Sequence, residues 1–140
     1  MGSSGVGFGA SGVALVRAAD AMLRALGGDT IVMVFPLVGM PNDPSAQLGL
    51  VDPGVQQVPM APVVMRDLTT AESGPRRRLE FLISSSAVAA ELAPMNAPTA
   101  EALFDMALGI LYDNDLFHIE SVTPEYFGGT TYLYRVVGVE

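Results

Sequence analysis

The sequence predicts one α+β domain over residues 1–140: an N-terminal helix, a mainly antiparallel sheet or small barrel, two short helices and a long extended arm. Three observations favour this class. The length of 140 residues suits a single ordinary domain. Helical periodicity is confined to three short stretches, while continuous or alternating apolar residues, typical of strands, fill much of the remainder.

The N-terminal segment predicts an arm followed by a helix. Residues 1–10 are rich in Gly and Ser and carry no charge, which is typical of a flexible arm. Ser11 is a candidate N-cap, and Gly27 with Gly28 should end the helix. One face of this helix has apolar residues at helical spacing and is expected to be buried: Leu15, Ala19, Met22 and Leu26.

A strand and a long irregular stretch come next. Thr30–Phe35 is apolar on both faces, which predicts a strand covered on both sides and ended by Pro36. Residues 37–61 contain repeated Pro and Gly without any period, yet they are richer in Leu, Val and Met than disordered linkers are. We therefore expect residues 37–61 to form an extended arm lying on a neighbouring subunit. Its candidate interface residues are Leu48, Leu50, Val55, Val58 and Met60.

A hairpin and two short helices follow the arm. Residues 62–68 and 76–84 predict two strands joined by the polar turn TTAESGP. Ser86 is expected to cap a helix that runs through Leu92, and Thr99 to cap a second one. The second helix should bury one apolar stripe, made of Ala100, Leu103, Phe104, Ala107 and Leu108.

The C-terminal third predicts a β-meander. Ile110–Tyr112 and Leu116–Val122 are expected strands on either side of an Asp-Asn-Asp turn. The segment TPEYFGGT is then expected to be a loop that leads into a last strand, Thr131–Glu140.

Composition restricts the classes of partner. Half of the residues are hydrophobic and only 16% are charged, against roughly 25% in a typical soluble domain, so we expect other chains to cover part of the surface. The longest apolar stretch, Ile31–Val38, is shorter than the about 20 residues of a membrane span, and no membrane partner is predicted. The net charge of −8 disfavours binding to the phosphate backbone of a nucleic acid.

Several patterns could support chemistry, but each has a simpler interpretation. Gly7–Gly12 matches G-x-G-x-x-G without a strand before it, so a flexible arm is favoured over a nucleotide site. Asp113–Asp115 lacks the spacing of an EF-hand loop, and a solvated turn is favoured. The chain has no Cys, which excludes disulfides and thiolate metal sites.

The candidate catalytic groups are similarly weak. His118, the only histidine, lies in a predicted strand, and Ser84–Ser86 lacks the sequence context of a catalytic serine. Glu120 and Glu125 are interpreted as solvated charges rather than a catalytic pair. We therefore expect no enzyme activity, no cofactor and no metal.

Arg76, Arg77 and Arg78 form the sole basic cluster and are further candidate interface residues. Two interpretations are equally favoured: a strand edge protected by charge, and a socket for acidic residues of a neighbouring copy. A nucleic-acid patch ranks third because no aromatic residues are interleaved with these arginines.

The segment ILYDNDLFHIESVTPEYFGGTTYLYRVVGVE, residues 110–140, resembles the C-terminal end of tailed-bacteriophage neck proteins of the head-closure or head–tail adaptor type. The matching pieces are Tyr112-Asp113, Phe117-His118-Ile119, Ser121-Val122, Pro124 and Tyr134-Arg135-Val136-Val137. The resemblance covers about the last quarter of the chain. The helix before the first strand is instead similar to tail-terminator or tail-completion proteins.

The resemblance implies a structural virion component that is assembled in the host cytoplasm. It would be a ring-forming head-to-tail connector, a homo-oligomer that joins the portal side of the capsid to the tail. Its partners would be portal or adaptor and tail proteins, and double-stranded DNA would pass through its acidic lumen without being held. Two alternatives stay open: a tail-terminator or tail-tube subunit, and a small-ligand-binding α+β domain or enzyme.

Overall fold

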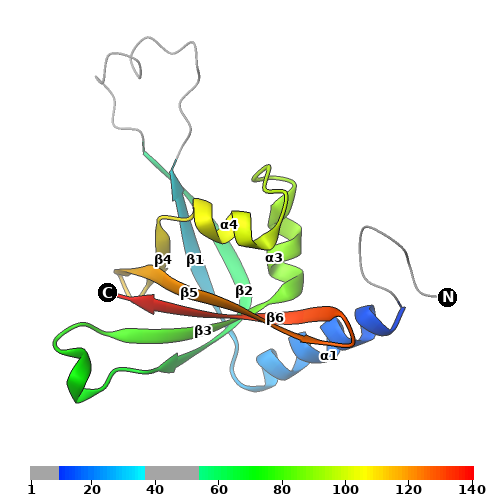
Figure 1. Cartoon of the computed structure of the whole chain (residues 1–140), viewed down its shortest axis with the longest axis horizontal. Helices are drawn as coiled ribbons and strands as arrows, with labels where there is room; N and C mark the ends of the chain where they lie inside the picture. The colour runs from blue at the N-terminus through cyan, green and yellow to red at the C-terminus, as the bar shows by residue number, and fades with distance from the viewer. Residues whose placement is uncertain (1–9, 37–53) are drawn as a thin grey trace, which may run out of the picture.

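A computed structural model describes residues 10–36 and 54–140, which form a six-stranded antiparallel closed barrel with three α-helices on its outside and at one end (Figure 1). The expected α+β class with a small barrel is confirmed. The expectations for residues 1–9 and 37–53 lie outside the described residues. The elements are α1 (Ala10–Ala25), β1 (Asp29–Pro36), β2 (Val55–Asp67), the 3-10 turn η1 (Ala71–Ser73), β3 (Arg78–Ser84), α3 (Ser85–Leu92), α4 (Ala100–Met106), β4 (Gly109–Tyr112), β5 (Asp115–Phe127) and β6 (Thr130–Val139).

The strand order around the barrel is β1-β2-β3-β6-β5-β4. Antiparallel pairing of β1 with β4, in which Val32 lies opposite Leu111, closes the barrel. The predicted hairpin of residues 62–68 and 76–84 is confirmed as the β2–β3 pair, with Val63 opposite Ile83. Each of the six described strands consequently has a hydrogen-bonded neighbour on both sides.

The predicted arm over residues 37–61 is wrong for its last part, because β2 already begins at Val55. Val58 and Met60 are only 5% and 1% exposed, so these two candidate interface residues belong to the barrel core. Pro59 misled the prediction because proline usually ends a strand. Pro59 pairs with Val32 of β1, while β2 pairs with β3 only from Val63 onward, so its missing N–H falls where one side of β2 is unpaired. Leu48 and Leu50 lie outside the described residues.

The predicted loop TPEYFGGT is also wrong, because most of it is strand. β5 continues to Phe127, β6 starts at Thr130, and these two residues lie opposite each other. Gly128 and Gly129 have φ angles of 58° and 80°. Positive φ at both central residues is the requirement of the tight hairpin turn that suits twisted strands. The result is one long β5–β6 hairpin.

The helix starts agree only in part with the predictions. Thr99 caps α4 as expected, since its Oγ1 accepts a hydrogen bond from the Ala102 amide at 3.1 Å. The cap of α3 is Ser84 rather than Ser86, because Ser84 Oγ accepts from the amides of Ser86 and Ala87. Within the predicted apolar stripe of α4, Leu108 is 44% exposed.

Helix α1 buries a different face from the one its apolar spacing predicts. Val16, Ala19 and Leu23 are buried, whereas Met22 is 45% and Leu26 62% exposed. The helix starts at Ala10, so Ser11 lies inside it. The cause of the rotation is Asp20, a charged residue outside the predicted apolar face, which is buried and hydrogen-bonded to the start of α3.

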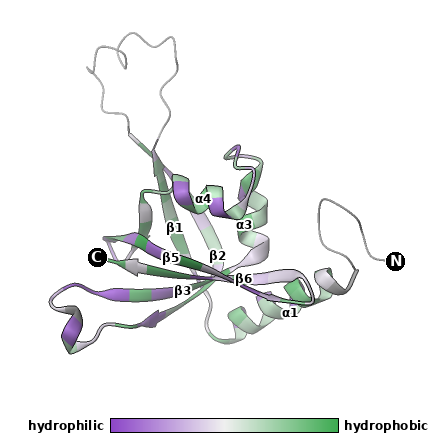
Figure 2. Ribbon diagram, viewed as in Figure 1, coloured by the Kyte–Doolittle hydropathy of each residue, from purple (hydrophilic) through white to green (hydrophobic). Residues whose placement is uncertain are grey.

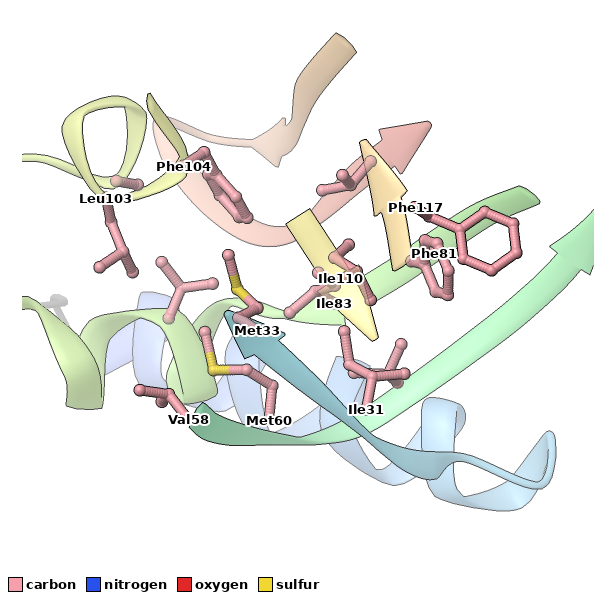
Figure 3. Packing of buried hydrophobic residues seen from close by; sticks show 14 of the residues in the cluster. Ile31, Met33, Val58, Met60, Phe81, Ile83, Leu103, Phe104, Ile110 and Phe117 are labelled. Carbon is pink, nitrogen blue, oxygen red and sulfur yellow. The ribbon is translucent and has the colours of Figure 1, made fainter. Parts of the chain in front are cut away.

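The barrel interior is filled by apolar side chains from all six strands, and one end is covered by α3 and α4. Phe81 lies among aromatic neighbours, with ring centroids 5.9 Å from Tyr112 and 6.1 Å from Phe117. Figure 3 shows Leu103 and Phe104 of α4 over the part of the cluster that contains Met33. The cluster includes Ile31, Met33, Phe35, Val58, Met60, Val63, Leu79, Phe81, Ile83, Val88, Leu103, Phe104, Ile110, Phe117 and Val136.

Candidate functional site

Ion pairs cross the outer face of the barrel over four adjacent strands. Glu80 of β3 is only 4% exposed, and its carboxylate binds Arg66 of β2 at 2.8 Å and Arg135 of β6 at 3.2 Å. Arg135 Nε also donates to Glu125 of β5 at 3.1 Å. The hydrogen bonds to Glu80, and then those to Glu125, raise the pKa of Arg135 above its usual value. This network is internal to the chain and stabilises the sheet.

The arginine cluster finds acidic partners within the same chain. Arg77 lies 3.5 Å from Asp113 and 3.5 Å from Asp115, and its guanidinium lies 5.5 Å from the Phe117 ring centroid. Arg78 binds Glu120 at 2.6 Å. β3 lies between β2 and β6, so the interpretation as a free strand edge is wrong. The interpretation as a socket for a neighbouring copy stays a prediction for Arg76, which is exposed and has no ion-pair partner among the described residues.

We expect Arg77→Ala to lower the free energy of unfolding by about 1 kcal/mol or less, because its partners are largely exposed and water screens such pairs. Urea unfolding at low and high salt would measure it. The difference between wild type and variant should shrink as salt rises. A loss of several kcal/mol would show that the contact with Phe117 and the turn carboxylates is a main determinant of stability.

A buried polar cluster joins α1 to the start of α3. Asp20 Oδ1 accepts from Ser84 Oγ and Asp20 Oδ2 accepts from Ser86 Oγ, both at 2.6 Å, and the two hydroxyl oxygens are 2.7 Å apart. Ser84 is fully buried and also caps α3. Its proton and its lone pairs are thus committed to structural hydrogen bonds. The arrangement joins two helices and does not present a serine nucleophile.

The other chemical candidates are dispersed over the molecule. His118 is exposed on β5, and Glu120 is paired with Arg78. Asp113 and Asn114 have φ angles of 55° and 64°, so the predicted turn is confirmed as the tight β4–β5 hairpin. Gly12 lies inside α1, while Gly7 and Gly9 are outside the described residues.

The described ranges contain no group of three His, Asp or Glu residues that could hold a metal ion. Among the helices described, none is both long and apolar enough to cross a membrane.

Besides Leu116 of β5, which is 37% exposed, large apolar side chains are exposed at three separate places on the described surface. The tip of the β5–β6 hairpin presents Tyr126 at 67% and Phe127 at 76% exposure. An open groove of about 400 Å³ separates this tip from the N-terminal half of α1, where Leu15 lines it. The end of α1 forms the second place, with Met22 and Leu26. The third lies where β2 begins and α4 ends, with Val55, Met106 and Leu108.

Sequence reasoning found only part of this surface. The sequence predicts Val55 as an interface residue, and it is 48% exposed, whereas Tyr126 and Phe127 lie in the predicted loop and are not among the predicted interface residues. The signal was present, because two aromatic residues directly before Gly-Gly predict the exposed tip of a hairpin.

One tyrosine connects α4 with the sheet. Tyr134 of β6 packs against Phe104 with ring centroids 5.5 Å apart. Burial raises the pKa of Tyr134, and the negative charge of Glu101 on α4 raises it further. Glu101 therefore lies close enough to this partly buried hydroxyl to affect it.

No known protein family, curated protein or solved structure that was compared with this chain matches it. The exposed apolar places and the distribution of charge around them are therefore the basis of the functional argument.

Proposed function

We propose that the protein is a ring-forming head-to-tail connector of a tailed bacteriophage, which joins the portal side of the capsid to the tail and lets DNA pass. The observation that carries the proposal is the set of large apolar side chains left exposed on a barrel whose described strands all pair on both sides. Phe127 is 76%, Leu26 62% and Val55 48% exposed. Patches of this kind, gathered on one small domain, are typical of protein–protein contact.

The distribution of these side chains favours a ring over an isolated dimer. A two-fold dimer uses one self-complementary patch, whereas a ring uses two different patches on each subunit. The apolar residues of α1 and those near α4 lie on different sides of the barrel (Figure 1). One subunit can therefore contact a neighbour on each side at the same time.

The charges support passage of DNA rather than binding. The net charge is −8, and four arginines, Arg66, Arg77, Arg78 and Arg135, are neutralised by carboxylates of the same chain. Few cations are left to displace counterions from a phosphate backbone. A ring of such subunits has an acidic surface that DNA would not adhere to.

The position in a phage particle is supported by the resemblance of residues 110–140 to neck proteins. The pieces of that resemblance occupy the β4–β5–β6 part of the barrel, from Tyr112 to Val137. This part includes the long hairpin with the exposed tip.

A stop codon in the gene, within a phage that encodes it, tests the function directly. We expect DNA-filled heads and complete tails that fail to join, with plaque formation restored by the intact gene on a plasmid. Electron microscopy of the lysate and plaque counts measure this. Infectious, fully joined particles lacking the protein would refute the proposal. Joined particles with tails of irregular length would instead favour the tail-terminator alternative.

A further inference from the structure

We propose that, in the ring of the proposed function, the outward face of α1 of one copy docks on the α4 side of the next copy. This inference rests on that function and deepens it, because it assigns the two surfaces of the subunit contact. The "α1 face" is defined by Arg17, Ala18, Ala21, Met22, Arg24, Ala25 and Leu26. The "α4 face" is defined by Glu101, Asp105, Met106 and Leu108.

The α1 face is apolar with a basic flank. All seven of its residues are exposed, and five of them are Ala, Met or Leu. Helical spacing places Ala18, Ala21 and Ala25 in one stripe and both arginines along its side. The only acidic residue of the helix, Asp20, is turned inward, where two serine hydroxyls bind it. The outward face is therefore positive as well as apolar.

The α4 face has the opposite charge. Glu101 and Asp105 are exposed and lie one helical turn apart, and neither has an ion-pair partner among the described residues. Met106 and Leu108, at 39% and 44% exposure, follow directly at the end of the helix. Figure 2 shows two hydrophilic bands on α4, whereas most of α1 has the hydrophobic colours.

Charge complementarity identifies a second copy as the occupant. Arg17 and Arg24 have no ion-pair partner among the described residues, whereas most other arginines do. Copies with a net charge of −8 repel each other at most approaches. Bringing the basic α1 face onto the acidic α4 face replaces that repulsion by attraction and buries apolar residues from both sides.

The geometry permits the contact to repeat. α1 and α4 lie on different sides of the barrel (Figure 1), so each copy offers one face forward and the other backward. A contact between two different faces of identical subunits closes into a ring when the rotation allows it. Arg17 and Arg24 lie about 10 Å apart along α1 and the two carboxylates about 6 Å apart along α4, a difference that the long arginine side chains can span.

Charge reversal with rescue tests the pairing. One variant carries Arg17→Glu with Arg24→Glu, and a second carries Glu101→Arg with Asp105→Arg. Each alone is expected to weaken subunit association at least tenfold, since like charges now meet. The chain that carries all four changes should regain assembly, because the attraction is restored with the signs exchanged. Native mass spectrometry and sedimentation measure association, and circular dichroism shows that each variant is folded.

Glu72→Arg is the matched control, because Glu72 is another exposed carboxylate without an ion-pair partner in the described chain. It should assemble like wild type. If assembly needs the portal, the same variants are compared by their ability to restore plaques to the stop-codon phage.

The outcomes separate the two proposals. A wild-type chain that forms no ring and joins no heads to tails refutes the function, and the inference with it. If both charge-reversed double variants still form rings, the inference alone is refuted. The α1 face would then be covered by residues 1–9 or by another protein. If both double variants lose assembly and the fourfold variant does not regain it, the pairing of the α1 face with the α4 face is also refuted.

Discussion

Replacing Phe81 by Ala is expected to lower the free energy of unfolding by about 3–5 kcal/mol, the usual loss when a core phenylalanine is truncated. The Phe81 ring is fully buried and makes edge contacts with the rings of Tyr112 and Phe117. A cavity left there cannot be filled by small shifts, because the hydrogen-bonded strands hold the barrel wall in place. Urea unfolding followed by circular dichroism measures the loss.

The matched control is Phe127→Ala, the same chemical change at a ring that is 76% exposed. Phe127→Ala should change the free energy of unfolding of the isolated chain by no more than about 0.5 kcal/mol. Equal losses for both variants would contradict the placement of Phe81 at the centre of the barrel.

Asp20→Ala is expected to have the second large effect, and to lower the free energy of unfolding by about 2–4 kcal/mol. Both carboxylate oxygens accept hydrogen bonds of 2.6 Å, and removing them leaves the hydroxyls of Ser84 and Ser86 without their acceptor in a buried place. The same change removes the hydrogen bonds that join α1 to the start of α3, while the apolar contacts of Val16, Ala19 and Leu23 remain. Hydrogen exchange should therefore show that α1 amides lose more protection than those of the barrel strands.

Asp20→Asn and Asp105→Ala serve as controls for that result. Asparagine keeps one acceptor oxygen, so the loss should be intermediate. Asp105 is exposed and has no ion-pair partner among the described residues, so its removal should change stability by about 0.5 kcal/mol or less. If Asp20→Ala cost no more than Asp105→Ala, the buried cluster would not be what holds α1.

Local patterns were sufficient for several parts of the fold. Leu79, Phe81 and Ile83 alternate along the chain with Arg78, Glu80 and Leu82, a pattern that predicts a strand with these three on its buried side, and all three are fully buried. Thr99 was recognised as a cap because its hydroxyl can reach the amide of Ala102 within one turn. Such features depend on neighbours within a few residues, so the sequence specifies them directly.

The sequence predictions are wrong where contacts with residues far along the chain determine the local structure. The buried face of α1 depends on Ser84 and Ser86, far along the chain, which draw Asp20 inward against the apolar periodicity. Pro59 and Pro124 suggested irregular structure, yet both lie at parts of a strand where only one side is paired.

The candidate surfaces could be predicted even less from the sequence. The partners of Arg77 and Arg78 lie on the β4–β5 hairpin, and the pairing of β6 with both β3 and β5 brings them close. Exposure of Met22 and Leu26 follows from the rotation of α1, so no local pattern could distinguish them from core residues.

Closure of the barrel has a consequence for biosynthesis. β1 can pair with β4, and β3 with β6, only after the later strand of each pair has been synthesised, and β6 is the last of the six described strands. Pairings so distant in sequence make folding slow compared with that of helical proteins of similar size. A chain cut short before β6 leaves β3 and β5 without the strand between them, and the cylinder then stays open.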